Sequence, residues 1–350
     1  MANFSDFTLD NGGITDLNKV LFATIFKYSS LFNTCTAMKG VKNGQKADAV
    51  DKLSDIGWTG RSCSPTYKTP TITGFEQTWA LGNWSAPLKF CYAELAATIA
   101  KYGLRTGTDA DNIQGTEFWQ KIYTPLFEDA VTRMYWRMSW FADTAAKNVT
   151  NSGVITDGKD VTLFTMADGF WKRMASQISG SAGQKTTIAA NAQSTYATQI
   201  SALRTDGVAI GIVDSILADA NSLIKDGVLM VTKSLADALR KDYRREYKAT
   251  IPFYEAAEGV QLEKYDGVFL LPVPEWDDVI RTYEDDGTKW NNPHRAVFAN
   301  PENLLVGTED KDLFADFDTG FNNETRVNYS YAASNIGTLI TEPTLFQAAY

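Results

Sequence analysis

The sequence is poor in the residues that most often carry chemistry, with one histidine and three cysteines among its 350 residues. The histidine, His294, lies between Pro293 and Arg295 in a turn-like segment, with no nucleophile motif beside it. A Ser-His-Asp or Cys-His system would have to use this residue, so we interpret it as structural or surface-lying rather than catalytic. The counts also exclude metal sites built from several histidines or from closely paired cysteines.

Disulfides, signal sequences and membrane spans are not indicated either. The three cysteines, Cys35, Cys63 and Cys91, are odd in number and widely spaced, which predicts neither a disulfide framework nor a zinc knuckle. The sequence has no run of about 18 apolar residues, and its first residues lack the basic and apolar segments of a secretory signal. We expect a protein that folds in a reducing cytoplasm and does not enter a membrane.

Positive charge is scarce relative to negative charge: 33 lysines and arginines against 42 aspartates and glutamates give a formal charge of -9. Proteins whose main task is to grip phosphate backbones need clustered basic residues, and the acidic balance argues against that class. Aromatic residues reach 12%, whereas charged residues make up only 21%. Such a composition is typical of buried surface, so we expect large subunit interfaces.

Recognisable catalytic and ligand-binding motifs are missing as well. Gly207 to Gly211 lacks the rest of a phosphate loop or dinucleotide fingerprint, and no nucleophile elbow occurs. The acidic clusters 284–287 and 309–312 lack the spacing of a calcium loop, and we interpret them as solvated loops. An acidic-residue hydrolase stays open as an alternative, because 42 acids and nine tryptophans could supply carboxylates and sugar platforms. The tryptophans are dispersed, however, which favours packing, and no catalytic, cofactor or metal residue is assigned.

In the first third of the chain, the predicted secondary structure changes from a helix to a β-ribbon. Apolar residues at helical spacing over 14–34 predict an amphipathic helix, followed by a loop over 40–60 with a weak helix at 47–54. Residues 61–90 alternate between proline or glycine and runs rich in Thr, Tyr, Trp and Phe, which predicts a long two-stranded ribbon. Helical spacing returns over 89–102. An isolated ribbon is marginal in water, so this one must pack on something.

The strongest helix signal begins at Thr124-Pro125, a cap followed by proline, and runs to about residue 147. A shorter helix is predicted at 116–123, and the small polar residues of 180–199 predict a loop or boundary. The remaining patterns predict an α/β unit and further strands: helix 208–224, strand 228–231, helix 234–243, strands 268–271 and 296–299, and an antiparallel pair within 313–333.

Three stretches make this order of parts resemble a known family. Phe75 to Leu95 looks like an extended loop returning toward a long helix, and Thr116 to Lys147 looks like that helix. The most specific stretch is Arg295 to Asp310. It looks like an apolar strand followed by an Asn-Leu turn and then a Gly-Thr-Glu-Asp segment. The chain thereby resembles the major capsid proteins of tailed bacteriophages, whose Hong Kong 97-like fold is shared with encapsulins and the herpesvirus capsid floor.

The resemblance implies an α+β fold of four parts. They are an N-terminal arm (1–57), an extended β-ribbon loop (58–90), a peripheral domain (91–165 and 308–333) with a spine helix at about 125–147, and an α/β axial domain (166–307 and 334–350). No scaffolding segment fits before the arm, which implies a separate scaffolding protein. A cross-linking pair could consist of Lys68 and one asparagine, either Asn322, Asn323 or Asn328, but we expect no covalent cross-link.

The resemblance also implies a structural role and no enzymatic one. Hexamers and pentamers would form an icosahedral shell in the virion, assembled in the host bacterial cytoplasm around double-stranded DNA that is enclosed without specific binding. Portal, decoration or head-completion proteins would be partners, and neither a cofactor nor a membrane is implied. Segments 1–34 and 61–90 would be buried only in the assembly, through these inter-subunit residues: Phe4, Phe7, Leu21, Phe22, Phe26, Tyr67, Phe75, Trp79 and Trp84. An encapsulin-like compartment shell is the alternative with the same layout.

Overall fold

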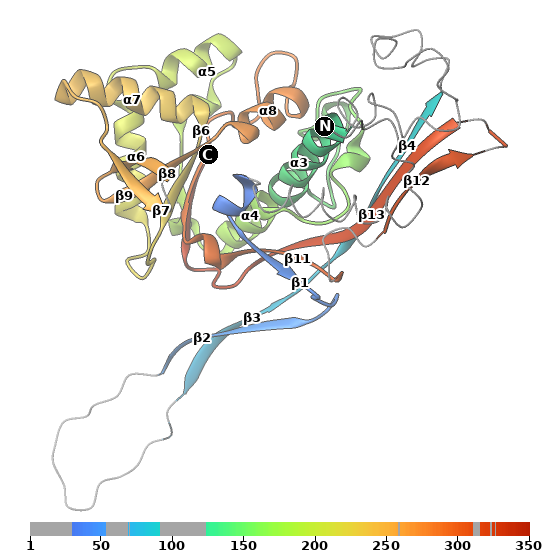
Figure 1. Ribbon diagram of the computed structural model, residues 1–350. Coiled ribbons are helices and arrows are strands. Elements are labelled where there is room, and N and C mark those ends of the chain that lie inside the picture. Colours follow the sequence, from blue (N-terminus) through green and yellow to red (C-terminus); the bar gives the residue numbers. More distant parts are fainter. Residues whose placement is uncertain are drawn as a thin grey trace, which may run out of the picture.

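The computed structural model describes residues 30–53, 69, 71–91, 124–257, 260–310, 316–322, 324–325 and 327–350 (Figure 1). Within these residues the protein is a mixed fold of helices and three sheets. The helices expected at 14–34 and 116–123 lie outside them, apart from a 3-10 turn at Ser30–Asn33. No helix of the described ranges is long and apolar enough to cross a membrane.

The largest sheet of the described chain has seven strands in the order β5-β14-β10-β6-β9-β8-β7. Its strands β10 and β14 are buried along their whole length, as expected for a sheet that is covered on both faces. β6 runs parallel to β9, whereas β10 is antiparallel to both of its neighbours. The strands are β5 (Lys185–Thr186), β6 (Val228–Thr232), β7 (Phe253–Ala257), β8 (Val260–Tyr265), β9 (Val268–Val273), β10 (Ala296–Ala299) and β14 (Phe346–Ala349).

Each face of this sheet packs on its own set of helices, because successive strand residues point to opposite faces. Leu229 and Val231 of β6 lie in one hydrophobic cluster with α5, α6 and α7. Met230, between them, lies in the other cluster with α3, α4 and α8. The helices are α3 (Thr124–Phe141), α4 (Phe170–Gly180), α5 (Tyr196–Leu203), α6 (Val208–Asp219), α7 (Lys233–Tyr247) and α8 (Pro274–Tyr283).

A second sheet is organised by β13, a strand of 14 residues. The last residues of β13 pair with β11, to which β1 adds in parallel, and its earlier residues pair with β12 on one side and β4 on the other. The antiparallel pair expected within 313–333 is thereby confirmed. The strands are β1 (Thr36–Lys39), β4 (Gly82–Cys91), β11 (Leu304–Thr308), β12 (Asp316–Asn322) and β13 (Val327–Ile340).

The third sheet is a ribbon of two antiparallel strands, β2 (Lys46–Leu53) and β3 (Ile72–Thr78), which projects away from the other elements (Figure 1). The weak helix expected at 47–54 is therefore wrong. The ribbon expected within 61–90 is also misplaced, because β4 pairs with β13 and the true partner of β3 is β2. Residues 46–49 alternate between polar and apolar, a strand pattern that the helix-favouring alanines concealed.

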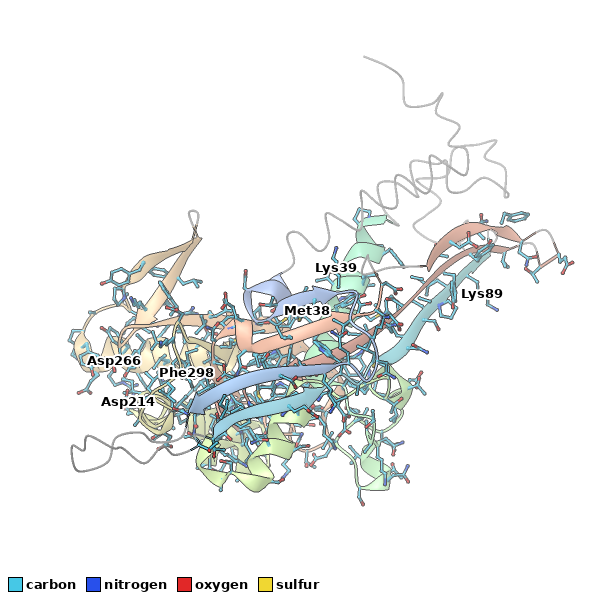
Figure 2. All side chains as sticks on the ribbon, turned by 90° about the horizontal axis from the view of Figure 1, so that it is seen from below. Met38, Lys39, Lys89, Asp214, Asp266 and Phe298 are labelled. Carbon is cyan, nitrogen blue, oxygen red and sulfur yellow. The ribbon has the colours of Figure 1, made fainter. Side chains whose placement is uncertain are left out.

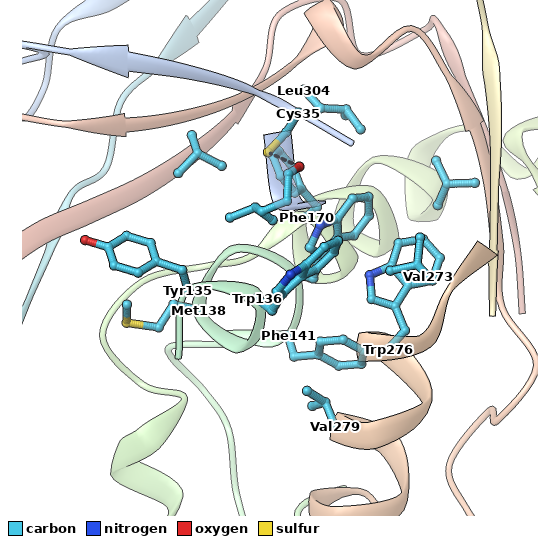
Figure 3. Close-up of a cluster of buried hydrophobic side chains, with 14 of the residues drawn as sticks. Cys35, Tyr135, Trp136, Met138, Phe141, Phe170, Val273, Trp276, Val279 and Leu304 are labelled. Carbon is cyan, nitrogen blue, oxygen red and sulfur yellow. Dashed lines mark hydrogen bonds between the residues drawn. The ribbon is translucent and has the colours of Figure 1, made fainter. Parts of the chain in front are cut away.

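Aromatic side chains from several elements meet around α3 (Figure 3). The Trp140 ring lies with its centroid 4.5 Å from that of Trp276 on α8 and 4.9 Å from that of Phe170 on α4. Trp171 joins them at 5.1 Å from Trp276. The tryptophans of this cluster thus serve packing, as expected, and α3 connects the two larger sheets.

Several expected elements are confirmed with different ends. α3 begins at Thr124 as predicted but ends at Phe141 instead of about residue 147, because the following chain turns to bond elsewhere. The Asp143 N–H donates to the Phe164 carbonyl (2.9 Å), and the Thr144 N–H donates to the Asp168 carboxylate (2.9 Å). α6 ends at Asp219 rather than 224, and α5 begins inside the expected loop at 180–199. β4 continues to Cys91, so no helix begins at residue 89.

Candidate assembly surfaces

The β2–β3 ribbon offers a surface that the described parts of its own chain leave open. Ile72, at the start of β3, is 67% exposed, and Phe75 in the middle of the strand is half-buried. Lys46 and Glu76 form an ion pair at 2.7 Å, but both side chains are exposed, and solvent screening leaves such pairs little stabilising effect. The ribbon therefore has little internal stabilisation, which suits an element that packs on another molecule.

Trp79 holds the base of the ribbon. It directly follows β3, and its side chain is only 2% exposed, packed with Val41 and Leu339. The ring lies against the backbone of Gly307, where a methyl group would come within 2.5 Å of the Trp79 Cζ3 atom. Glycine leaves the room that the indole needs at this position.

A second glycine completes this attachment. Gly337 of β13 pairs with Gly307 of β11, and a methyl group at Gly337 would lie 2.6 Å from the Ala80 carbonyl oxygen. The Trp79 N–H also donates to the Gln45 carbonyl (2.9 Å), which joins both strands of the ribbon at the same point. We call Trp79, Gly307 and Gly337 the tryptophan seat, since together they fix where the ribbon leaves the second sheet.

A second open surface lies at the far end of β13, between β4 and β12. Near the helices this sheet is covered: Trp84 of β4 is 6% exposed and contacts the Tyr135 ring edge-on, with centroids 5.9 Å apart. Farther out, Leu88 and Tyr331 are both exposed, and the strand register places them on opposite faces. Figure 2 shows this end of the sheet, marked by Lys89, extending beyond the helices. The face that carries Tyr331 is therefore open to a neighbour, whereas Asn328 and Ser330, on the face of Leu88, are buried.

The structure corrects the predicted inter-subunit residues in part. Trp79 and Trp84 are buried by their own chain, so the expectation that all of 61–90 is buried only in an assembly is wrong for them. Gly307 and Gly337, which lie against Trp79 and its neighbour Ala80, and Tyr135, which contacts Trp84, are distant in sequence and give no local signal. Phe75 lies on the ribbon as expected, and the remaining predicted residues lie outside the described residues: Phe4, Phe7, Leu21, Phe22, Phe26 and Tyr67.

Sequence reasoning missed the exposed apolar residues of the strands, Ile72, Leu88 and Tyr331. Alternation indicates a strand, but it does not tell which face another molecule covers.

His294 occupies a buried structural position. Its Nε2 lies 3.3 Å from the Gln199 carbonyl oxygen, which can only accept, so Nε2 carries the proton and Nδ1 accepts from Ser234 Oγ at 2.8 Å. Burial lowers the pKa of His294 to about 4, so the ring is neutral near pH 7. Because a backbone carbonyl takes the place of a carboxylate beside Nε2, the contact with Ser234 is not a catalytic triad, and the structural interpretation is confirmed.

The acidic cluster 284–287 is only in part the solvated loop that the sequence predicts, since Asp286 and Gly287 are exposed but Glu284 is built into the fold. Glu284 is buried and forms an ion pair with Arg295, whose guanidinium also donates to the carbonyls of Asn291 (2.9 Å) and Asn292 (2.8 Å). The same guanidinium lies over the Phe141 ring, 5.2 Å from its centroid. This pair therefore joins α8, β10 and α3. No group of three or more potential metal ligands occurs in the described ranges.

The specific 295–310 stretch owes its form to Asn300 and Asn303. The Asn300 side chain accepts from the Glu302 N–H and caps the 3-10 turn Pro301–Asn303 that joins β10 to β11. The buried Asn303 side chain donates to the Glu342 carbonyl (3.0 Å) and accepts from the Glu342 N–H (2.7 Å). The turn thus fastens the ends of the two larger sheets to each other.

Comparison with known proteins gives matches in structure only, since no family model and no curated protein matches the sequence. The chain is similar to a chain of the satellite phage P4 procapsid including size determination (Sid) protein, with TM-score 0.50, 10% identity, and coverage of 95% of this chain and 98% of that one. It is similar to a Gordonia phage Cozz chain with TM-score 0.50, 9% identity, and coverage of 92% and 85%. The capsid of an empty GTA particle matches with TM-score 0.50, 13% identity, and coverage of 92% and 89%. The chain therefore has the fold of phage capsid proteins.

Proposed function

We propose that this chain is the structural major capsid protein of a tailed bacteriophage, with the Hong Kong 97-like fold. The observation that carries the proposal is the fold likeness to a procapsid chain over 95% of this chain and 98% of the other. The surfaces agree with it, because a ribbon that the described residues hold at its base and a sheet end with an exposed face around Tyr331 are elements that a neighbouring subunit would cover.

The proposal keeps the four-part organisation with one change of boundary. α3 is the spine helix, β4, β12 and β13 belong to the peripheral domain, and the seven-stranded sheet with α5, α6 and α7 is the axial domain. The extended loop is the β2–β3 ribbon together with residues 54–71 between its strands, rather than 58–90. Residues before the ribbon form the arm.

Assembly would proceed through heterologous contacts that close into hexamers and pentamers. Ile72 and Phe75 of the ribbon, and Tyr67 from the segment between its strands, would pack on a neighbouring subunit. The apolar residues of the arm would reach across a subunit boundary. The tryptophan seat would set the direction of the ribbon in every subunit. The hydrogen-bonded strands beyond the seat would absorb the difference between the two ring types by bending.

The shell would enclose double-stranded DNA without gripping it. A formal charge of -9 suits a wall along which phosphate slides, provided that the inner face is not strongly basic. Partners would be a separate scaffolding protein, a portal, and decoration or head-completion proteins. The protein would be made in the host bacterial cytoplasm and reside in the virion.

The test is to express the full chain alone and examine it by sedimentation and negative-stain electron microscopy. We expect multimers, rings or particles, and a stable monomer or small oligomer at micromolar concentration would overturn the proposal and favour a hydrolase. Deleting residues 1–34 should leave a folded chain that no longer forms shells, so normal particles from that truncation would disprove the role of the arm. An encapsulin-like shell would form similar particles, and neighbouring terminase and portal genes would separate the two.

A further inference from the structure

The seven-stranded domain carries a groove that none of the contacts described above uses. It has a volume of about 900 Å³ and lies between α6, the end of α7 and the turn from β8 to β9. Four tyrosines line it: Tyr243, Tyr247, Tyr254 and Tyr265. Tyr247 and Tyr254 are more than half exposed, so their rings are open to a ligand.

The charged side chains of the groove are mainly acidic. Asp214 and Asp266 lie at the same edge of the molecule (Figure 2), and both are exposed. The hydroxyl of Tyr265 donates to the Asp214 carboxylate at 2.7 Å and holds it in place. The one lysine of the lining, Lys264, lies over the Tyr254 ring at 5.6 Å. Tyrosine rings beside two carboxylates attract guanidinium and ammonium groups, through ring faces and charge-assisted hydrogen bonds.

A matching set of cations lies on the same helix, on a different side. Lys241, Arg244 and Arg245 follow each other at helical spacing along the exposed end of α7, and Lys248 directly follows the helix. Tyr243 and Tyr247 form the stripe that lines the groove. Arg245 pairs with Asp206. Within the described ranges the other three have backbone carbonyls as their hydrogen-bond acceptors and no carboxylate: Arg204 O for Lys241, Arg240 O for Arg244 and Arg245 O for Lys248.

We propose that the tyrosine groove receives the basic end of α7 from a second copy of this chain. The inference rests on the proposed function and specifies one contact within the rings. Tyr243 and Tyr247, which line the groove, and the basic residues lie on different sides of one rigid helix. The basic side chains of a subunit therefore cannot reach the groove of the same subunit. Each copy therefore offers one half of the contact to each neighbour, a head-to-tail arrangement that closes into rings. Charge attraction of this kind steers association and weakens as salt rises.

Charge substitutions in the full chain test the contact. The double variant K241E/R244E should reduce the fraction of protein in multimers at least tenfold at low salt. The matched control K147E/K225E makes the same change of net charge at exposed lysines outside the groove and the basic stripe, and should stay within twofold of the unchanged protein. D214N/D266N should act like K241E/R244E, and asparagine keeps the positive φ of 44° at Asp266 accessible.

A disulfide trap gives a readout that does not depend on shell formation. Chains carrying Ala218→Cys in the groove and differently tagged chains carrying Arg244→Cys are co-expressed and oxidised. We expect a mixed disulfide dimer on a non-reducing gel that is absent when either variant, or the unchanged chain, is oxidised alone. Multimers that form normally in K241E/R244E, without a mixed dimer, would overturn the groove contact and leave the capsid proposal standing. An unchanged chain that stays monomeric would overturn the capsid proposal itself.

Discussion

The seven-stranded sheet and the β2–β3 ribbon are both β-structure, but they are stabilised in different ways. Strands β10 and β14 are buried along their whole length between two sets of helices. The ribbon presents exposed side chains and is held at one end by the tryptophan seat. Apolar burial contributes roughly 25 cal/mol per Å², so the first region is stable within one chain, whereas under the proposed function the second would gain its missing burial from a neighbour. Substitutions in the sheet should therefore lower the free energy of unfolding of the single chain. Substitutions in the ribbon should instead reduce assembly and leave that free energy nearly unchanged.

The largest loss of stability should come from the aromatic cluster. Trp140→Ala removes a fully buried ring that contacts Phe170 and Trp276, and should lower the free energy of unfolding by about 3–5 kcal/mol. Urea unfolding of the unassembled chain measures this. Leu126→Ala, at an exposed position of the same helix, is the control and should stay within about 0.5 kcal/mol. Equal losses from both variants would contradict the assignment of the core.

The next largest effect should be a pH dependence that arises from His294. Its pKa is about 4 in the folded protein and 6.5 when exposed, so between these values the unfolded chain binds more protons and folding becomes less favourable as pH falls. The shift corresponds to about 3 kcal/mol, lost progressively from pH 6.5 down to pH 4. Urea titrations at pH 7, 5.5 and 4 should show a steeper loss in the natural chain than in His294→Gln. Parallel pH profiles for the two chains would contradict the buried neutral ring.

A substitution at the junction of the two regions should affect both. Gly307→Val places a side chain where the Trp79 ring lies, and should cost about 1–3 kcal/mol by overpacking while also displacing the ribbon. Unfolding measurements and particle counts would detect the two effects separately. Gly211→Ala in α6 is the control, because a methyl group there meets open space, and it should stabilise the chain by up to about 1 kcal/mol. Normal particles from Gly307→Val would show that the seat does not direct the ribbon.

The smallest effect on stability, but a large one on assembly, is expected for the ribbon. Ile72→Ser changes a side chain that is 67% exposed in the single chain, so the free energy of unfolding should change by less than about 0.5 kcal/mol. Sedimentation should nevertheless show fewer particles, since the proposal buries this residue against a neighbour. If particle yield and unfolding both stay unchanged, the ribbon is not an assembly surface at this position.

Much of the fold was predictable because its signals are local. The start of α3 follows from a threonine cap and proline, and β6 and β10 follow from short apolar runs bounded by turn residues. The strand and the turn of the 295–310 stretch were also visible, although strand β11 after the turn was not predicted. In each case the residues that decide the structure are neighbours in sequence.

The remaining features depend on residues that are far apart in sequence. Trp79 looks like an exposed ribbon aromatic until Gly307 and Gly337 supply a place for its ring. Strand β2 has helix-favouring residues and becomes a strand because β3 pairs with it. The sequence around Glu284 predicts a solvated acidic segment, but in the structure Glu284 is buried because it pairs with Arg295. The tyrosine groove likewise gathers residues from α6, α7 and the β-turn that no motif connects.

Strand β13 has a mechanical consequence. Its first residues pair with β4 and β12 and its last four with β11, so one continuous backbone runs from the open sheet end to the interior beside the helices. The hydrogen bonds lie perpendicular to this backbone. A pull on the open end along the strand would therefore load many of these bonds together in shear, instead of peeling them apart one after another. In a capsid shell under outward pressure, β13 would carry tension from one subunit boundary into the interior of the protein.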